Sequence, residues 1–340
     1  MNVPHIGVFE AGARGTIADV AGVAVGHCTL NDGDIRTGVT VVRPHDGDIY
    51  RDKVPAAACV INGFGKSVGL VQLDELGVLE TPVALTNTFG IGAVAQAQVR
   101  SACEANAKIG RDWPSVNPLV LECNDGYLND MQAFAVEEAH YRDALAACSA
   151  DFARGSVGAG RGMSCFELKG GIGAASRIVH IEGHAYTTGA LVLANFGRLP
   201  QLTIAGDTVG RRLHAAMQSN AAPEQGSIIM LVATDAPLDS RQLRRVAMRA
   251  AAGLARTGSV YGHGSGDIAL AFSTAYTVPH EAAFIAMPPL LGDAFIDPLF
   301  QSTADSIEQA ILDALFSAKS VTGRDGHRRL SLKDALRTQP

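Results

Sequence analysis

Apolar, β-rich segments come in blocks along this chain, and this order constrains the fold more than any other feature of the sequence. Three such segments open it, at residues 20–30, 38–44 and 56–62, with Asp-Gly turns between them. Helical stretches come later and do not alternate with every strand. A chain with this order packs sheet on sheet with helices outside. The sequence therefore predicts an α+β fold in place of a doubly wound parallel sheet.

The remaining elements are predicted from apolar periodicity and from the positions of glycine, proline and capping residues. Strands are expected at 81–87, 118–126, 227–237 and 267–274, with a hairpin over 175–197 that turns at Glu182-Gly183. Helices are expected at 93–108, at 207–219, from a cap at Asp239 or Ser240 to a stop at Gly258, and along the face of Ile307, Ala310, Ile311, Ala314, Leu315 and Ala318. Residues 220–225 are expected to form an exposed loop, and the Arg-rich tail from Gly323 to fray or to contact a partner.

The composition fits a folded, enzyme-sized chain. Of 340 residues, 47% are hydrophobic and 18% are charged, which supplies enough apolar surface for a core and excludes a disordered chain. The length alone allows one or two domains. A net charge of −6 argues against a nucleic-acid partner, because such proteins carry a basic excess. The low charged fraction suggests that part of the surface is buried against other subunits.

Targeting and crosslinking signals are not visible in the sequence. No apolar run reaches the ~18 residues that a bilayer span needs, and the first residues show no basic region followed by an apolar core. The six cysteines are widely spaced without a CxxC pair, which is typical of reduced thiols. We therefore expect no membrane association and a cytoplasmic location, with a periplasmic one left open.

Two glycine-rich motifs suggest nucleotide binding at first sight. Residues 61–69 resemble a phosphate-binding loop, but Val60 stands where that motif needs its first glycine. Gly90-x-Gly92 follows a strand and precedes a helix, which is the context of a dinucleotide fingerprint. The acid that would bind the ribose, Glu122, comes 30 residues after Gly92, where about 20 are expected. A closely packed strand-to-helix turn is the simpler interpretation, and a dinucleotide-dependent enzyme stays an alternative.

A metal site is a further candidate in the hairpin. His180, Glu182 and His184 alternate along one stretch of sequence, as ligands on one strand face would. They straddle the expected turn at Gly183, however, and no HExxH motif accompanies them. We interpret them as solvated turn residues and expect no metal.

The segment 224–237 places a serine where a hydroxyl is unusual. Ser227 follows Gly226 and a polar loop, and it is the first residue of an apolar strand. A serine at a strand edge is the ordinary interpretation. If the bond between Gly226 and Ser227 were cut, Ser227 would carry both a hydroxyl and an α-amine with a pKa of about 7.7–8.0, which can serve as general base. Glycine before it removes side-chain bulk around the bond that the hydroxyl would attack.

A second polar group lies downstream, in the segment 261–270. Gly262, Gly264 and Gly266 alternate there with His263, Ser265 and Asp267, just before a strand. By itself this pattern is typical of a turn with a polar cap, because glycines allow tight turns. Beside Ser227, the hydroxyl of Ser265 and the carboxylate of Asp267 could orient a nucleophile.

Taken together, these segments and several others resemble the self-cleaving serine aminopeptidases, a family that includes the L-aminopeptidase/D-esterase-amidase and the β-peptidyl aminopeptidases. The likeness runs from about residue 15 to 323. It is carried by IADVAGVAVGH, RTGVTVV, VINGFGKSVGL, ELGVLETPVALTNT, NDGYLND, FELKGGIGAASR, LVLANFG, GSIIMLVATDAPL and LARTGSVYGHGSGDIALAFST.

The resemblance implies a role for each matching residue. Ser227 is the expected nucleophile, freed by cleavage after Gly226 into fragments 1–226 and 227–340. Ser265 and Asp267 are expected to support proton transfer at Ser227. Asn195 is similar to the side chain that donates to the oxyanion. These four residues form the expected catalytic group.

The resemblance also implies how substrate is held. Glu122 is similar to the acid that binds the free α-amine of a substrate. Asn124 stands where relatives often have an aromatic residue, so we expect a wider or more polar pocket there. The implied fold is a four-layer αββα sandwich, a single domain over 1–340 that resembles N-terminal-nucleophile hydrolases. Tetramers or larger homo-oligomers are implied, and no cofactor or metal.

The sequence thus predicts an enzyme that releases N-terminal residues from short peptides, amides or esters through an acyl-enzyme on Ser227. An acyltransferase on a related self-cleaving scaffold is an alternative, although the similar ornithine acetyltransferases use threonine. A binding protein that kept the scaffold without turnover is another.

Overall fold

Two β-sheets face each other at the centre of the molecule. The computed structural model describes residues 3–217 and 226–337. The smaller sheet has the order β1 (Ala24–Leu30), β2 (Thr37–Arg43), β5 (Val83–Asn87), β6 (Leu119–Cys123). The larger has the order β13 (Val278–Pro279), β3 (Asp52–Gly63), β12 (Gly266–Ser273), β11 (Ser227–Thr234), β10 (His184–Asn195), β9 (Gly171–Ile181), with β4 (Val78–Leu79) on β3.

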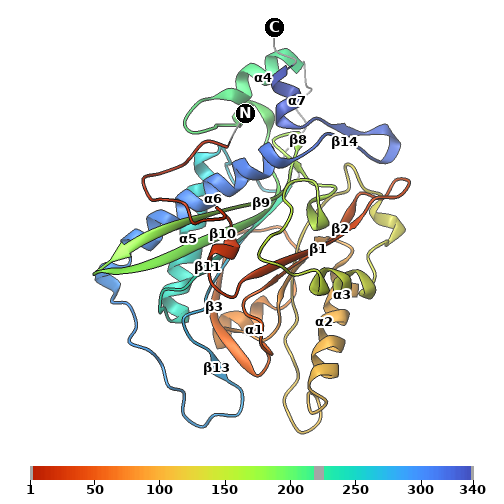
Figure 1. Cartoon of the computed structure of the whole chain (residues 1–340). Helices are drawn as coiled ribbons and strands as arrows, with labels where there is room; N and C mark the ends of the chain where they lie inside the picture. The colour runs from red at the N-terminus through yellow and green to blue at the C-terminus, as the bar shows by residue number, and fades with distance from the viewer. Residues whose placement is uncertain (1–2, 218–225, 338–340) are drawn as a thin grey trace.

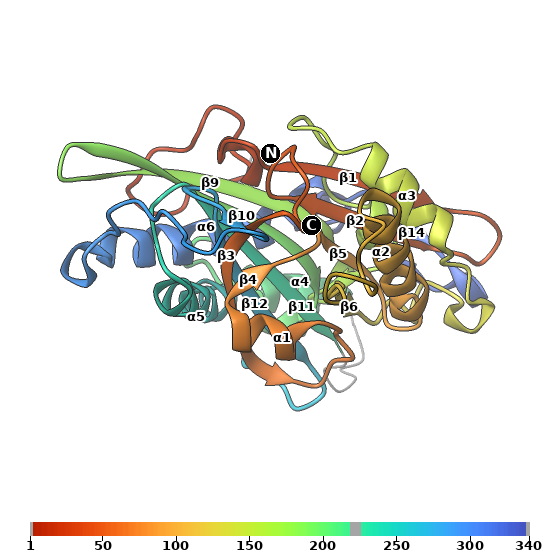
Figure 2. The same cartoon turned by 90° about the horizontal axis from the view of Figure 1, so that it is seen from below.

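Helices cover the outer face of each sheet. On the smaller sheet lie α2 (Ile91–Ala105) and α3 (Glu138–Ala146), and on the larger sheet α5 (Ser240–Arg256) and α6 (Asp297–Ser317). Figure 2 shows these pairs on opposite sides of the molecule. Shorter helices are α1 (Leu70–Leu76), α4 (Val209–Met217) and α7 (Leu332–Arg337). The predicted αββα sandwich of the α+β class is confirmed.

Strand β11 shows why strands of the larger sheet consist of continuous apolar sequence. Its Ile229 and Leu231 belong to the core between the two sheets, whereas Ile228 and Met230 belong to the core under α5 and α6. Successive side chains of a strand point to opposite faces, so a strand buried on both faces must be apolar at every position. This double burial places the first residue of β11 deep in the fold.

Several predicted elements are confirmed in detail. The hairpin of β9 and β10 turns at Glu182 and Gly183, both with positive φ. Helix α5 begins after Asp239, whose side chain accepts a hydrogen bond from the backbone N–H of Gln242 at 2.7 Å. Gly258 follows the helix with φ of 103°, as its stop requires.

Other expectations were wrong or incomplete. The tail from Gly323 does not fray: β14 (Val321–Thr322) pairs with β15 (Arg328–Arg329), and Leu332 of α7 is fully buried. Helix α6 begins at Asp297, before the apolar face that predicted it. The expected loop 220–225 lies outside the described residues. No helix in 3–217 and 226–337 is long and apolar enough to span a membrane.

Candidate active site

At the ends of three neighbouring strands, the candidate nucleophile lies beside residues that are expected to assist it. Ser227 opens β11, and its direct partners across the sheet are Asn195, the last residue of β10, and Gly266, the first of β12. Paired residues on adjacent strands lie close together. The register of the larger sheet therefore assembles segments that are distant in sequence.

The hydroxyl of Ser227 accepts a hydrogen bond from the backbone of β12. The N–H of Gly266 donates to Ser227 Oγ at 3.2 Å. A Cβ at position 266 would lie 2.7 Å from the carbonyl oxygen of Phe64 and 3.2 Å from Ser227 Oγ. Glycine is required here because any side chain would collide with the backbone of Phe64 and crowd the hydroxyl.

The residue before the serine is equally constrained. A Cβ at Gly226 would lie 2.2 Å from the carbonyl oxygen of Asn195 and 2.9 Å from the Cα of Phe196. Backbone atoms of β10 cannot move aside as a flexible side chain would. The predicted lack of bulk at Gly226 therefore has a concrete cause, the close approach of β10.

Ser265 and Asp267 flank Gly266 and are both fully buried. Ser265 Oγ donates to Asp267 Oδ1 at 2.7 Å. Along β12, Asp267 shares its face with Ala269, which belongs to the core under α5 and α6, whereas Ile268 belongs to the core between the sheets. The pair thus lies next to Ser227, but on the face of the sheet opposite to the one that Ser227 shares with Ile229.

The turn that carries Ser265 is held by an asparagine that the sequence analysis did not single out. Asn62 of β3 donates from Nδ2 to the carbonyl oxygens of Gly262, at 2.9 Å, and Ser265. Asn62 also pairs with Asp267 across the sheet. It lies in the segment VINGFGKSVGL, so the family resemblance was the one signal that pointed to this part of the chain.

Asn195 is held in one orientation by two backbone groups. Its Oδ1 accepts from the N–H of Ser164 at 2.8 Å, and its Nδ2 donates to the carbonyl oxygen of Asn124 at 2.9 Å. An amide Nδ2 carries two hydrogens, so the second stays available as a donor. A fixed donor beside Ser227 is the geometry that oxyanion stabilisation needs.

A buried lysine stabilises the segment that binds Asn195. Lys169 of β8 (Leu168–Lys169), which pairs with β7 (Ser164–Cys165), is fully buried. Its Nζ donates to the carbonyl oxygens of Gly160, Met163 and Gly170 at 2.7–2.9 Å. Burial lowers the pKa of Lys169. These three bonds anchor the segment that presents the Ser164 N–H to Asn195.

Glu122 lies on β6, in the smaller sheet, with 3% of its surface exposed. Its Oε1 accepts from the N–H of Lys66 at 2.9 Å, and its Oε2 from the hydroxyl of Thr88. These bonds hold the carboxylate, and no cation among the described residues is a direct partner of it. Asn124, two residues on, is exposed, and its Oδ1 accepts from the N–H of Gly126 at 2.9 Å.

A single cavity of about 1250 Å³ unites these groups. Its walls include Ser227, Gly226, Asn195, Glu122 and Asn124. Ser265 and Asp267 are not among its lining residues and lie beneath it. The structure thus gathers all the predicted site residues in one place, with Ser265 and Asp267 in a supporting layer.

The alternative sites of the sequence analysis lie elsewhere or are otherwise engaged. A Cβ at Gly90 would meet Thr86 Oγ1 at 2.7 Å, so this glycine serves close packing at the start of α2. Glu122 lines the cavity that contains Ser227, whereas neither Gly90 nor Gly92 is among the residues that line it. His180, Glu182 and His184 are exposed around the tip of the β9–β10 hairpin, at the left in Figure 1.

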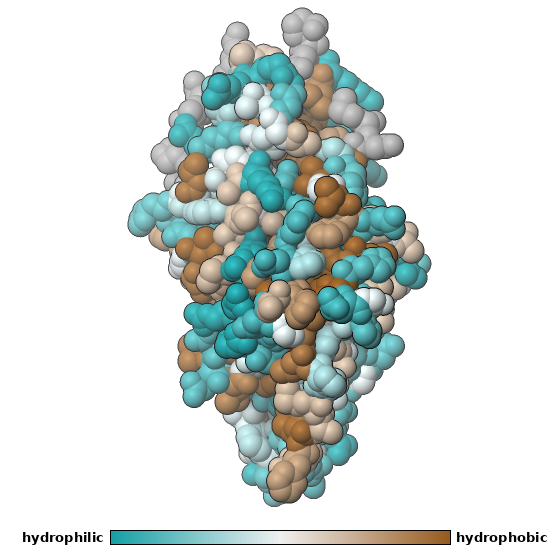
Figure 3. Space-filling model, turned by 90° about the vertical axis from the view of Figure 1, so that its left-hand side faces the viewer, coloured by the Kyte–Doolittle hydropathy of each residue, from teal (hydrophilic) through white to brown (hydrophobic). Residues whose placement is uncertain are grey.

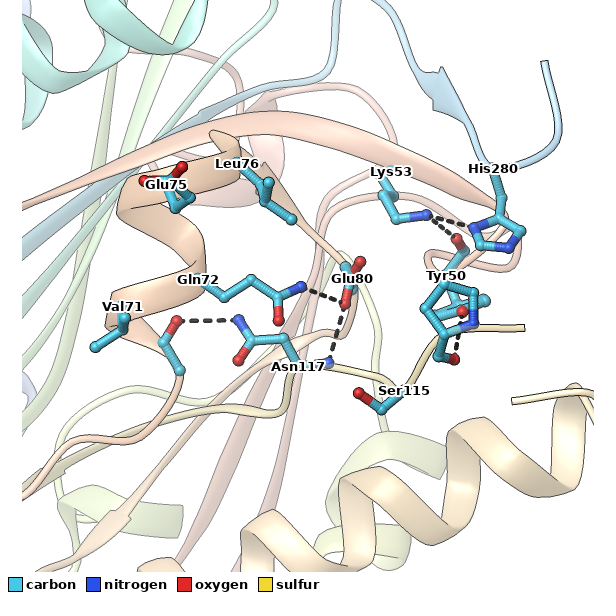
Figure 4. A pocket seen from close by; sticks show the side chains of 12 residues that line it. Tyr50, Lys53, Val71, Gln72, Glu75, Leu76, Glu80, Ser115, Asn117 and His280 are labelled. Carbon is cyan, nitrogen blue, oxygen red and sulfur yellow. Dashed lines mark hydrogen bonds between the residues drawn. The ribbon is translucent and has the colours of Figure 1, made fainter. Parts of the chain in front are cut away.

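A second cavity, of about 720 Å³, lies between α1 and the segment around His280 (Figure 4). Its polar groups satisfy one another. Lys53 Nζ donates to the Tyr50 carbonyl oxygen at 2.7 Å and to His280 Nδ1 at 3.1 Å. Glu80 Oε2 accepts from Gln72 Nε2 at 2.9 Å. None of the predicted site residues lines this cavity.

Paired sheets between helices, with a serine opening a central strand and a fixed amide beside it, define the class of N-terminal-nucleophile hydrolases. Residues 15–329 match the family described as Peptidase family S58, and the chain belongs to that family. It is a hydrolytic serine aminopeptidase of the N-terminal-nucleophile type. The expectation of an aminopeptidase, rather than an acyltransferase or a dinucleotide enzyme, is confirmed.

Individual relatives agree with this assignment. A β-peptidyl aminopeptidase, BapA, of Sphingosinicella microcystinivorans is 38% identical, over 96% of this chain and 87% of its own length. The PH0078 protein of Pyrococcus horikoshii OT3 is 51% identical with a TM-score of 0.92, covering 98% of this chain and 96% of that one. The L-aminopeptidase D-Ala-esterase/amidase of Ochrobactrum anthropi, described as a variant of the Ntn hydrolase fold, is 35% identical with a TM-score of 0.90, covering 98% and 95%.

Proposed function

We propose that the chain cleaves itself between Gly226 and Ser227 and that the freed Ser227 is the catalytic nucleophile. The observation that carries this proposal is the position of Ser227, at the first residue of a central strand, beside Asn195 and Gly266. In cleavage, Ser227 Oγ attacks the Gly226 carbonyl carbon and the peptide nitrogen leaves as the α-amine. Water then hydrolyses the resulting ester, which yields fragments 1–226 and 227–340.

In turnover, the new α-amine takes the proton of the Ser227 hydroxyl as Oγ attacks the substrate carbonyl. Asp267 and Ser265 flank Gly266, the sheet partner of Ser227, and support this proton transfer at the amine. Asn195 Nδ2 donates to the oxyanion of the tetrahedral intermediate. The amine then gives its proton to the leaving group, and water releases the acyl group from Ser227.

The substrate class follows from the far wall of the cavity. Glu122 binds the free amino group of the substrate, because a buried carboxylate without a cation as direct partner favours an ammonium group. Short peptides, amides and esters with a free N-terminus are therefore the proposed substrates. Relatives named as β-peptidyl aminopeptidases support β-amino acids as candidates beside α-amino acids. Asn124, which is polar and exposed, also lines this part of the cavity.

Mass spectrometry of the active protein tests self-cleavage directly. We expect two fragments, of which the smaller begins Ser-Ile-Ile-Met and contains residues 227–340. Both should remain associated under native conditions, since β11 and β12 of one fragment pair with β10 and β3 of the other. An intact chain that turns over substrate would contradict the proposal.

Replacing Glu122 with glutamine should select against substrates with a free amine. The amide keeps the size of the side chain but loses the charge that attracts an ammonium group, so we expect about a 10- to 100-fold loss of kcat/KM on an aminoacyl anilide. The N-acetylated anilide, tested with wild type and variant, should show little change in its low rate. Equal losses on both substrates would remove the proposed role of Glu122.

A homo-oligomer, tetramer or larger, and a cytoplasmic location are part of the proposal. The segment between β13 and α6 forms the lower loop in Figure 1 and exposes Phe284, Ile285 and Met287. Figure 3 shows apolar atoms at the lower end of the face it displays. Phe284, with 94% of its surface exposed, would be covered in an assembly.

A further inference from the structure

The active-site cavity contains a group of arginines that the proposed mechanism does not use. Arg198 follows β10, whereas Arg324 and Arg329 come from the hairpin of β14 and β15. The tail that was expected to fray thus contributes two cations to the wall of the cavity. Their presence needs an explanation beyond the hydrolysis of a peptide bond.

Arg329 is fixed in place by neutral groups. Its guanidinium lies over the ring of Tyr127, with Cζ 3.7 Å from the ring centroid, and its Nε donates to Ser164 Oγ at 3.2 Å. Within residues 3–217 and 226–337, no carboxylate lies within ion-pair distance of it. Burial lowers the pKa of Arg329, which reflects the cost of holding this charge away from water. Glu167 lines the same cavity and attracts Arg329 without a direct ion pair, so the guanidinium keeps donors for a further carboxylate.

The two other arginines add to the positive charge around it. Arg198 makes no ion pair with any described residue, and its Nε is buried without a hydrogen-bond partner there. Arg324 is braced by the carbonyl oxygen of Gly126, at 2.6 Å from its Nε, and by the exposed carboxylate of Asp325. Glu167 is the carboxylate that lines the cavity near Arg329, and the three arginines outnumber it, which leaves an excess of positive charge there.

The arginines and Glu122 line the same cavity and are linked to Asn195 through different contacts. Ser164 links the two parts, since its N–H donates to Asn195 Oδ1 and its hydroxyl accepts from Arg329. On the other side of Asn195, Nδ2 binds the Asn124 carbonyl, two residues after Glu122. A carbonyl held at Ser227 and Asn195 therefore has both a carboxylate and guanidinium groups in the same cavity.

We propose that Arg329, with Arg198 and Arg324, binds the free C-terminal carboxylate of the leaving portion of the substrate. The preferred substrates are then di- and tripeptides with both termini free, recognised by Glu122 at the amino end and by the arginines at the carboxyl end. This inference rests on the proposed function, because it takes Ser227 as the point of attack.

The test compares a dipeptide that the wild-type enzyme hydrolyses with its C-terminal amide. We expect amidation alone to lower kcat/KM of the wild type by about 10- to 100-fold, chiefly through KM, as the loss of a charged hydrogen-bonded pair predicts. Arg329→Gln should remove most of this preference, because it should lower kcat/KM for the free dipeptide more than for the amide. Arg329→Lys keeps the charge without the planar fork and should give an intermediate preference.

Arg328→Gln is the matched control, because Arg328 is the exposed neighbour on β15 and does not line the cavity. It should retain the wild-type preference. A wild-type enzyme that hydrolyses the amide as well as the free dipeptide would overturn the inference, and so would equal losses on both in Arg329→Gln. A failure of the proposed function itself would give a different result. The wild-type protein would then lack the cut after Gly226, or its turnover would not depend on Ser227.

Discussion

Replacing Ser227 with alanine should leave the chain uncut and reduce its aminopeptidase activity by about a million-fold. The alanine keeps the Cβ but removes the oxygen that, in the proposed mechanism, attacks both the Gly226 carbonyl and the substrate. Loss of the nucleophile in other serine peptidases has an effect of this size. Denaturing electrophoresis should show one band of 35.4 kDa in place of two smaller ones, and an anilide assay should show no hydrolysis above background.

Ser306→Ala is a suitable control for this experiment. Ser306 is a fully buried serine of α6 whose Oγ has no hydrogen-bond partner among the described residues, so its loss should leave the fold undisturbed. This variant should be cut and active. If Ser227→Ala instead folded, stayed intact and still hydrolysed the anilide, the nucleophile would have to be sought among other residues.

The central strands could be predicted because burial on both faces leaves a strong trace in the sequence. Strand β11 is apolar at 228–233, and the β9–β10 hairpin combines β-rich arms with a glycine turn. The tail could not be predicted in the same way. Its β14–β15 hairpin is only two residues long on each side, and α7 has six residues, so neither forms a periodic pattern.

The candidate site likewise contains residues that could be predicted from the sequence and residues that could not. Ser227 and the segment around Gly266 stand out because a serine at the head of an apolar strand and alternating glycines are locally unusual. Register, by contrast, is a property of the whole sheet: nothing local in Asn195 reveals that it pairs with Ser227. The family resemblance supplied Asn195 and Glu122. Nothing local marks Arg329, because its proposed role depends on contacts with Tyr127 and Ser164, which are distant in sequence.

Replacing Asn195 with alanine should lower kcat by about 10²- to 10³-fold, with a much smaller effect on KM. In the proposed mechanism the amide donates to charge that develops in the tetrahedral intermediate, so its contribution appears in the transition state rather than in substrate binding. Asn195 pairs with Ser227 across the sheet in the uncut chain, and we expect self-cleavage to slow as well. Steady-state kinetics and a time course of the two fragments after synthesis measure the two effects.

Asn31→Ala provides the comparison, since Asn31 is an exposed asparagine that accepts hydrogen bonds from Arg161 and does not line the cavity. Its kinetics and cleavage should match the wild type.

The two bonds that hold Asn195 also make a sharper distinction possible. If Asn195 served only to brace Ser164 and Asn124, its removal would loosen the cavity wall and raise KM while kcat stayed near the wild-type value. That pattern would mean that the oxyanion is stabilised by another donor, because a group acting on the transition state must change kcat.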